Sequence, residues 1–197
     1  MLFPPDVFNE RVCAFIDAFY GTMEEDFSKR GWPWVEPLRS EVGWKHPDLD
    51  VSFPGHYEDR AIKRIRVHFK RLPGTVELRG GHPELSYEHV VDITLPREYP
   101  AALDTIRFAF VTQIFHPRVH PGGTGPACVV VNGDIDRVIT NIKEQILLNP
   151  SVVMPPSLFG STDHGNNYEA MRWYERDPYG IHRLLVQRWE EAHGVHG

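Results

Sequence analysis

Two segments in the middle of the chain, residues 87–95 and 105–111, place apolar side chains at every second position. This period of two predicts β-strands with one buried face. The turn-rich stretch PREYPAAL joins the segments and is short enough for neighbouring antiparallel strands. A further short strand is expected at 76–78, ended by Gly80-Gly81. The centre of the chain is therefore predicted to form an antiparallel sheet.

Helical periodicity flanks these strands on both sides. Apolar residues three and four positions apart predict three amphipathic helices, over about 6–30, 58–72 and 135–146. Pro73-Gly74 is expected to end the second of them, and a last helical region over about 167–192 is divided by Pro178. Because helices and strands are segregated along the chain, the predicted fold class is α+β rather than a parallel βαβ sheet.

The composition of the chain changes near residue 57. Residues 32–57 include four prolines, which exclude a long regular element, and three tryptophans, which are unusual in a free linker. We therefore predict an N-terminal helix and Trp/Pro-rich connector over 1–57, followed by the main domain over 58–197.

Charge and residue counts exclude several classes of protein. The 197 residues contain 21 Lys+Arg and 27 Asp+Glu, a net charge of −6 that disfavours general binding to nucleic acid. No apolar run approaches the roughly 20 residues of a membrane-spanning helix. With two cysteines and no basic leader pattern at the start, we expect no disulfide scaffold, no secretory signal and a cytoplasmic location.

The segment 114–134, between the last predicted strand and the next helix, is rich in proline and glycine and contains Cys128. Loops of this kind on a rigid scaffold are common places for functional sites. From the residues alone, Cys128 could be a small buried group, a metal ligand, a protease nucleophile or a carrier of an acyl group. Cys13, beside the apolar face of the first helix, is expected to be a buried core residue.

A metal site in this segment is disfavoured. His116 and His120 would need a helix to point both imidazoles at one ion, and Pro117 and Pro121 prevent that helix. We therefore predict neither a metal nor a cofactor, and the other roles of Cys128 stay open at this point.

Six pieces of residues 59–192 resemble, in the same order, elements of the ubiquitin-conjugating enzyme (E2) family. AIKRIRVHFKRLP looks like its first helix, VVDITLPREYP like its strand with a Tyr-Pro corner, and TIRFAFVTQIFHP like the strand that enters its His-Pro element. Cys128 follows His116 by twelve residues, close to the family spacing of the catalytic cysteine. DRVITNIKEQILLNP and NNYEAMRWYERDPYGIHRL resemble the helices after that cysteine. The resemblance implies a UBC-like fold: a short antiparallel meander sheet flanked by helices, here with an N-terminal helical extension.

The sequence departs from the family pattern at several points. His-Pro-Asn becomes His116-Pro117-Arg118, so the asparagine credited with supporting isopeptide formation is missing. The tryptophan that commonly follows the cysteine is absent, the sheet looks one strand short, and the first 57 residues have no counterpart in a minimal E2. These departures resemble divergent bacterial E2-like proteins, which are often encoded in antiviral defence operons.

The resemblance implies a transferase whose partners are an E1-like activating enzyme, a ubiquitin-like protein and an acceptor protein. Cys128 would accept the ubiquitin-like protein as a thioester and pass it to an amine. The candidates for assisting this chemistry are His116, Arg118, Asn132, Asp163 and His164. The candidates for docking the activating enzyme lie on the predicted basic helix: Lys63, Arg64, Arg66 and Lys70. A structural role for His116, turn and capping chemistry for Asp163, and a solvated charged face for the basic residues are the competing interpretations.

Two other functions compete with the carrier. One is a non-catalytic scaffold, like the E2 variants, that binds a ubiquitin-like protein without carrying it; such relatives usually lack the cysteine. The other is a cysteine hydrolase that cleaves conjugates. In none of these functions do we expect nucleic acid or a membrane as a partner.

Overall fold

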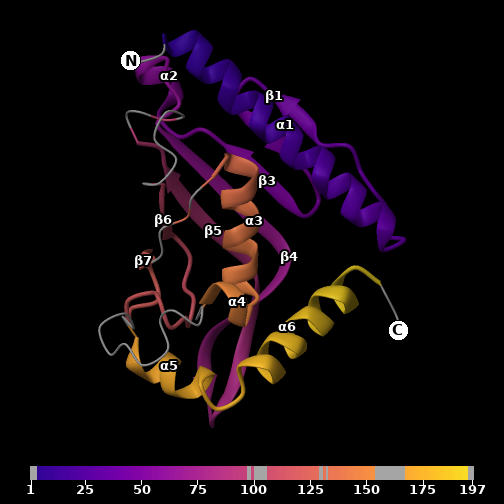
Figure 1. Cartoon of the computed structure of the whole chain (residues 1–197), viewed down its shortest axis with the longest axis vertical. Helices are drawn as coiled ribbons and strands as arrows, with labels where there is room; N and C mark the ends of the chain where they lie inside the picture. The colour runs from indigo at the N-terminus through magenta and orange to yellow at the C-terminus, as the bar shows by residue number, and fades with distance from the viewer. Residues whose placement is uncertain are drawn as a thin grey trace.

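The computed structural model describes residues 4–96, 99, 106–128, 131, 133–153 and 167–194 (Figure 1). In chain order the elements are α1 (Pro5–Lys29), β1 (Leu38–Ser40), β2 (Gly43–Lys45), β3 (Leu49–Ser52), α2 (His56–Asp59), β4 (Arg64–Arg79), β5 (His82–Thr94), β6 (Arg107–Phe110), β7 (Gly125–Pro126), α3 (Ile135–Ile146), α4 (Pro150–Val153), α5 (Tyr168–Tyr174) and α6 (Pro178–Ala192).

Within these residues, seven strands form a single antiparallel sheet in which each strand pairs with its neighbour in sequence, from β1 to β7. Helices α3 and α6 pack on β4, and α1 packs on α3 (Figure 1). The α+β class and the antiparallel meander predicted from the sequence are confirmed. This order of a helix, a meander and further helices is also consistent with the UBC-like arrangement that the resemblance implied.

The helix predicted over 58–72 is wrong, because most of this segment is strand β4. Ile62, Ile65, Phe69 and Leu72 fit a helical stripe, but Ile65, Val67 and Phe69 also alternate with charged residues, and these three are buried. Strand pairing on both sides decides between the two periods: Val67 lies opposite Val51 of β3 and Val91 of β5. The segment that resembled the first helix of the E2 family is therefore a central strand.

Pro73-Gly74, predicted to end a helix, lies inside β4 at an irregularity. The register between β4 and β5 shifts between Lys70 and Gly74, and Arg71 has a φ of 56°. A β-bulge accommodates proline within a strand because it interrupts the hydrogen-bond ladder. The sequence suggested that the sheet lacks one strand. This expectation is wrong, because β4 continues through the bulge to Arg79.

The sheet also crosses residue 57, the predicted boundary between two parts of the chain. Strand β3 pairs with β4, from Leu49 opposite Phe69 to Ser52 opposite Arg66. Segments on both sides of the boundary therefore share one sheet. Tryptophans from the connector and residues of α1 belong to the same core as the strands; Trp32, Trp44, Val12 and Ile16 are all buried in it. The connector is therefore part of the folded unit and not a tether.

Helices α1, α3, α5 and α6 agree with the periodicity of the sequence, whereas the four-residue helices α2 and α4 were not predicted. Helix α1 spans Pro5–Lys29, where 6–30 was predicted, and α3 matches the predicted stripe at 135–146. The last helical region is divided at Pro178, the first residue of α6. In the described part of the chain no helix combines the length and apolar character that crossing a bilayer requires.

Candidate functional site

Cys128 is exposed and lies two residues after the short strand β7. The chain around it is held by main-chain hydrogen bonds. Ala127 forms a bridge with Val119 and donates its N–H to the oxygen of Phe108 at 3.1 Å. The N–H of Cys128 donates to the carbonyl oxygen of Arg118 at 2.8 Å. An exposed thiol is thus presented on a backbone that neighbouring segments hold in place.

The His116-Pro117-Arg118 sequence forms the turn beneath Cys128. The N–H of Val119 donates to the oxygen of His116 at 3.2 Å and closes this turn. His116 is 1% exposed, and its Nδ1 accepts the N–H of Arg118 at 3.0 Å. Burial, together with the nearby charge of Arg118, lowers the pKa of His116 to about 3. A neutral, buried imidazole of this kind favours the structural role over proton transfer.

Arg118 stands where the E2 family has asparagine, and its side chain is buried. It is 3% exposed, and its Nε donates to the carbonyl oxygen of Val153 at 3.1 Å, at the end of α4. Burial lowers the pKa of Arg118, while the negative charge that Cys128 can carry opposes this shift. The backbone of Arg118 therefore contacts Cys128, while its buried guanidinium is held by the carbonyl oxygen of Val153.

Asn167 connects the His116-Pro117-Arg118 turn to helix α5. Its N–H donates to the oxygen of Pro117 at 3.3 Å, and its side chain accepts the N–H of Ala170 at the start of α5. The sequence indicated turn and capping chemistry ahead of this helix, but not a contact with the His-Pro turn. The other candidates for assisting chemistry, Asn132, Asp163 and His164, lie outside the described residues.

The four predicted docking residues do not share a helix face. Lys63 pairs with Asp59, Arg64 and Arg66 with Asp92 of β5, and Lys70 with Asp50 of β3. Arg66 is bound most firmly, through two hydrogen bonds of 2.7 and 2.9 Å to the carboxylate. Because side chains alternate along β4, Arg64, Arg66 and Lys70 lie on the face of the sheet that is opposite to the buried face. Much of their charge is thus used in cross-strand pairs.

Cys13 provides an internal comparison for Cys128. It lies on α1, is partly buried against the core, and burial raises the pKa of its thiol. The sequence prediction of a core cysteine is therefore close, although Cys13 keeps partial exposure. Among the described residues no group of three or more His, Cys, Asp and Glu side chains has the arrangement of a metal site.

We expect iodoacetamide to label the folded protein at Cys128 about ten times faster than at Cys13, because the thiolate reacts, Cys128 is the more exposed of the two, and burial raises the pKa of Cys13. Peptide mass spectrometry of samples quenched over time would measure both rates. The same protein unfolded in urea is the control, in which the rates should converge. Equal rates in the folded protein would contradict the exposure of Cys128.

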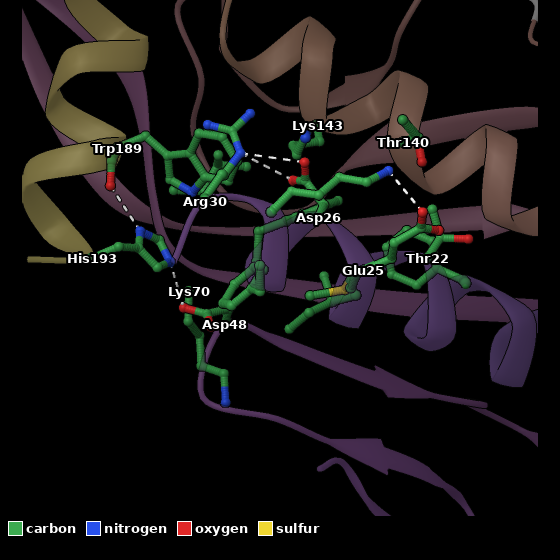
Figure 2. Close-up of a pocket in the computed structure, with 17 residues that line it drawn as sticks. Thr22, Glu25, Asp26, Arg30, Asp48, Lys70, Thr140, Lys143, Trp189 and His193 are labelled. Carbon is green, nitrogen blue, oxygen red and sulfur yellow. Dashed lines mark hydrogen bonds and ion pairs between the residues drawn. The ribbon is translucent and has the colours of Figure 1, made fainter. Parts of the chain in front are cut away.

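A separate cavity of about 330 Å³ lies between α1, α3, α6 and strands β3 and β4 (Figure 2). Its apolar wall includes Phe27, Leu49 and Trp189, and no cysteine lines it. Figure 2 shows the imidazole of His193 between two oxygen acceptors: Nδ1 is 2.7 Å from the carbonyl oxygen of Trp189, and Nε2 is 2.9 Å from Oδ1 of Asp48.

The contact between His193 and Asp48 fastens the end of α6 to the sheet. Arg71 also donates to Oδ1 of Asp48, at 2.6 Å. Burial raises the pKa of Asp48, but the hydrogen bond and charge of His193, together with Arg71, outweigh burial and leave this pKa below its ordinary value. Trp32 stacks on the imidazole with ring centroids 4.3 Å apart. No pattern in the sequence connects Asp48 and His193, which are 145 residues apart.

Comparisons with known proteins add little to this geometry. No protein-family model matches the sequence, and no curated protein matches it. Among solved structures, the chain is similar to the crystal structure of a putative ubiquitin conjugating enzyme from Plasmodium yoelii. The two chains are 18% identical, the match covers 75% of this chain and 82% of that chain, and the TM-score is 0.38. A likeness at this TM-score carries no argument for a shared activity.

Proposed function

We propose that the protein is an E2-like carrier that holds a ubiquitin-like protein as a thioester on Cys128. The observation that carries the proposal is the exposed thiol of Cys128, anchored through its N–H to the carbonyl of Arg118 in the His116-Pro117-Arg118 turn. A carrier needs a thiol that the tail of another protein can reach, and it needs a fixed backbone beside that thiol.

The proposed reaction consists of two acyl exchanges. In the first, the Cys128 thiolate attacks the thioester carbonyl that joins the ubiquitin-like protein to its E1-like enzyme. The new C–S bond forms, the old one breaks, and the thiolate of the activating enzyme leaves. In the second, an acceptor amine attacks the thioester on Cys128, a C–N bond forms, the Cys128 thiolate leaves, and the amine gives its proton to a base or to water.

We propose that Arg118 replaces the missing asparagine in stabilising the reaction intermediate. Each exchange passes through a tetrahedral intermediate with a negatively charged oxygen, which a nearby fixed positive charge stabilises. Arg118 contacts Cys128 through its backbone oxygen, and the hydrogen bond from its buried guanidinium to Val153 limits the movement of the side chain. Because a buried arginine keeps its geometry, it need not reorganise when the charge develops.

The partners and setting of the reaction belong to the same proposal. Both cysteines are free, which suits a reducing cytoplasm. Docking of the activating enzyme on Lys63, Arg64, Arg66 and Lys70 stays a prediction, now on and beside strand β4 rather than on a helix. The placement in bacterial antiviral defence rests on the sequence resemblance alone.

The test is a loading reaction with the cognate E1-like enzyme, the ubiquitin-like protein and ATP, analysed on a non-reducing gel. We expect an adduct that thiol removes and that Cys128→Ala abolishes. Cys128→Ser should give an adduct that resists thiol, since an oxyester replaces the thioester. Cys13→Ala is the matched control and should load like the unmodified protein.

Three outcomes would replace the carrier with another function. An adduct that survives Cys128→Ala would show that another residue is loaded. Binding of the ubiquitin-like protein without an adduct would support the scaffold, and cleavage of a conjugate without ATP would support the hydrolase.

A further inference from the structure

A second hollow, of about 520 Å³, lies between α1 and the segment that includes β1 and β2. We call it the α1–β1 groove. Helix α1 lines one side, and the connector with its two short strands lines the other. Its lining residues are Asp17, Tyr20, Gly21, Glu24, Trp34, Glu36, Pro37, Arg39 and Trp44. Neither Cys128 nor any residue of the turn beneath it is among them.

The lining combines aromatic rings with an excess of negative charge. Three carboxylates and one guanidinium, that of Arg39, line the groove. Within the described part of the chain, Glu24 and Glu36 have no ion-pair partner, whereas Asp17 has Arg39. Unpaired carboxylates beside the electron-rich faces of aromatic rings attract cations, and the attraction increases where the cation loses part of its water.

Arg39 shows how the α1–β1 groove binds a guanidinium. Its Cζ lies 5.0 Å from the ring centroid of Trp44, and its Nη1 lies 3.7 Å from Oδ2 of Asp17. The indole N–H of Trp44 donates to the other oxygen of Asp17 at 3.1 Å and fixes that carboxylate against the ring. One tryptophan and one carboxylate thus hold one cation. Trp34, Glu24 and Glu36 line the same groove, and the Trp34 ring is held in place by His46 and Phe27, with ring centroids 4.7 and 5.7 Å away.

The strand next to the groove has a free edge. Among the residues that the structure describes, strand β1 is the first strand of the sheet and pairs only with β2, and all three of its residues are exposed. Leu38 is 70% exposed and Val35 is 50% exposed, so two apolar side chains beside the groove face water. An unprotected strand edge with exposed apolar neighbours can pair with an extended segment of another protein.

We propose that the α1–β1 groove binds a basic, extended segment of a partner protein. The backbone of that segment pairs with the edge of β1, and one lysine or arginine side chain enters the groove at Trp34, Glu24 and Glu36. Charge complementarity selects a basic partner. This surface is separate from Cys128, so the proposal does not depend on thioester chemistry.

The probe is the peptide acetyl-Thr-Val-Arg-Val-Thr-amide, titrated into the full ¹⁵N-labelled protein. We expect it to shift the indole N–H signals of Trp34 and Trp44. The same peptide with glutamine in place of arginine should bind at least about tenfold more weakly, because it lacks the cation. Raising the salt from 50 to 300 mM should weaken binding of the arginine peptide as well.

Two double variants with the same change of net charge distinguish binding at the α1–β1 groove from nonspecific attraction of a basic peptide to an acidic protein. Glu24→Gln with Glu36→Gln should raise the Kd of the arginine peptide at least fivefold. Glu10→Gln with Glu169→Gln, both exposed and outside the groove, should change it less than twofold. An unchanged melting temperature confirms that each variant is folded.

Absence of indole shifts at 10 mM peptide would overturn the proposal. So would equal shifts with the arginine and glutamine peptides, or equal weakening in the two double variants. Cys128→Ala should abolish the adduct in the loading reaction but leave peptide binding in the NMR titration unchanged. The two experiments therefore distinguish failure of this proposal from failure of the proposed function.

Discussion

Lowering the pH from 7 to 5 should remove about 4 kcal/mol from the free energy of unfolding, roughly 2 kcal/mol for each of two buried histidines. Burial, with the charge of Arg118, lowers the pKa of His116 to about 3, and burial lowers that of His89 to about 4. In the unfolded chain both should titrate near 6.5. Below that pH the unfolded state binds protons that the folded state excludes, so stability falls as the pH falls. Total stabilities of domains are about 5–15 kcal/mol, so this loss is large.

Urea unfolding at pH 7, 6 and 5 measures this effect. Burial also lowers the pKa of His46, which acts in the same direction. Asp48 does not contribute in this window, because its pKa is below the ordinary value and its stabilisation is lost only in stronger acid. His89→Gln should reduce the loss between pH 7 and 5 by about 2 kcal/mol. His82→Gln, at an exposed position, should leave the loss unchanged. Equal stability at pH 7 and 5 would contradict the burial of His89 and His116 as neutral groups.

Replacing Gly43 by alanine should destabilise the protein by about 3 kcal/mol or more. Gly43 has a φ of 148°, and a Cβ atom there would lie 1.8 Å from the carbonyl oxygen of Val51. This oxygen belongs to β3, so the added methyl group can be accepted only if β2 and β3 move apart. At about 2–4 °C per kcal/mol for a chain of this size, the melting temperature should fall by roughly 10 °C.

Gly80→Ala is the matched control for this prediction. Gly80 also has a positive φ, 60°, but no atom of the described residues lies within 4 Å of the position that a Cβ would take. Only the backbone preference is lost there, which costs about 1 kcal/mol. If both variants melt at the same temperature, the close approach of β2 and β3 at Gly43 is not what constrains that position.

Local patterns predicted those elements whose period had one interpretation. The stripe of α1, the stripe of α3 and the alternation in β5 and β6 each fit a single element. In β4 the same residues fit two periods, and only pairing with strands distant in sequence selects one of them. The short strands β1 to β3 were missed for a similar reason. With three or four residues each, they owe their structure to their neighbours in the sheet.

The candidate site shows the same limit at the level of single side chains. A thiol in a Pro/Gly-rich loop was the expected candidate, and its exposure agrees with that expectation. The burial of Arg118 could not be predicted, because arginine is rarely buried and its partner Val153 lies 35 residues away. For His116 the structure favours the structural role that competed with proton transfer. Short sequence patterns indicate where chemistry can occur, but burial depends on segments that meet only in the fold.

The neighbour-to-neighbour order of the sheet has a consequence for how the chain folds during its synthesis. Strands β4 and β5 form the longest pair and are joined by the two-residue turn Gly80-Gly81, in which both residues have positive φ. Such a hairpin can form early, because its closure requires little loss of chain entropy, and each further strand can then join an existing edge. The contact of Asp48 with His193 must wait until the end of the chain has left the ribosome. We therefore expect the sheet to form vectorially and α6 to dock last.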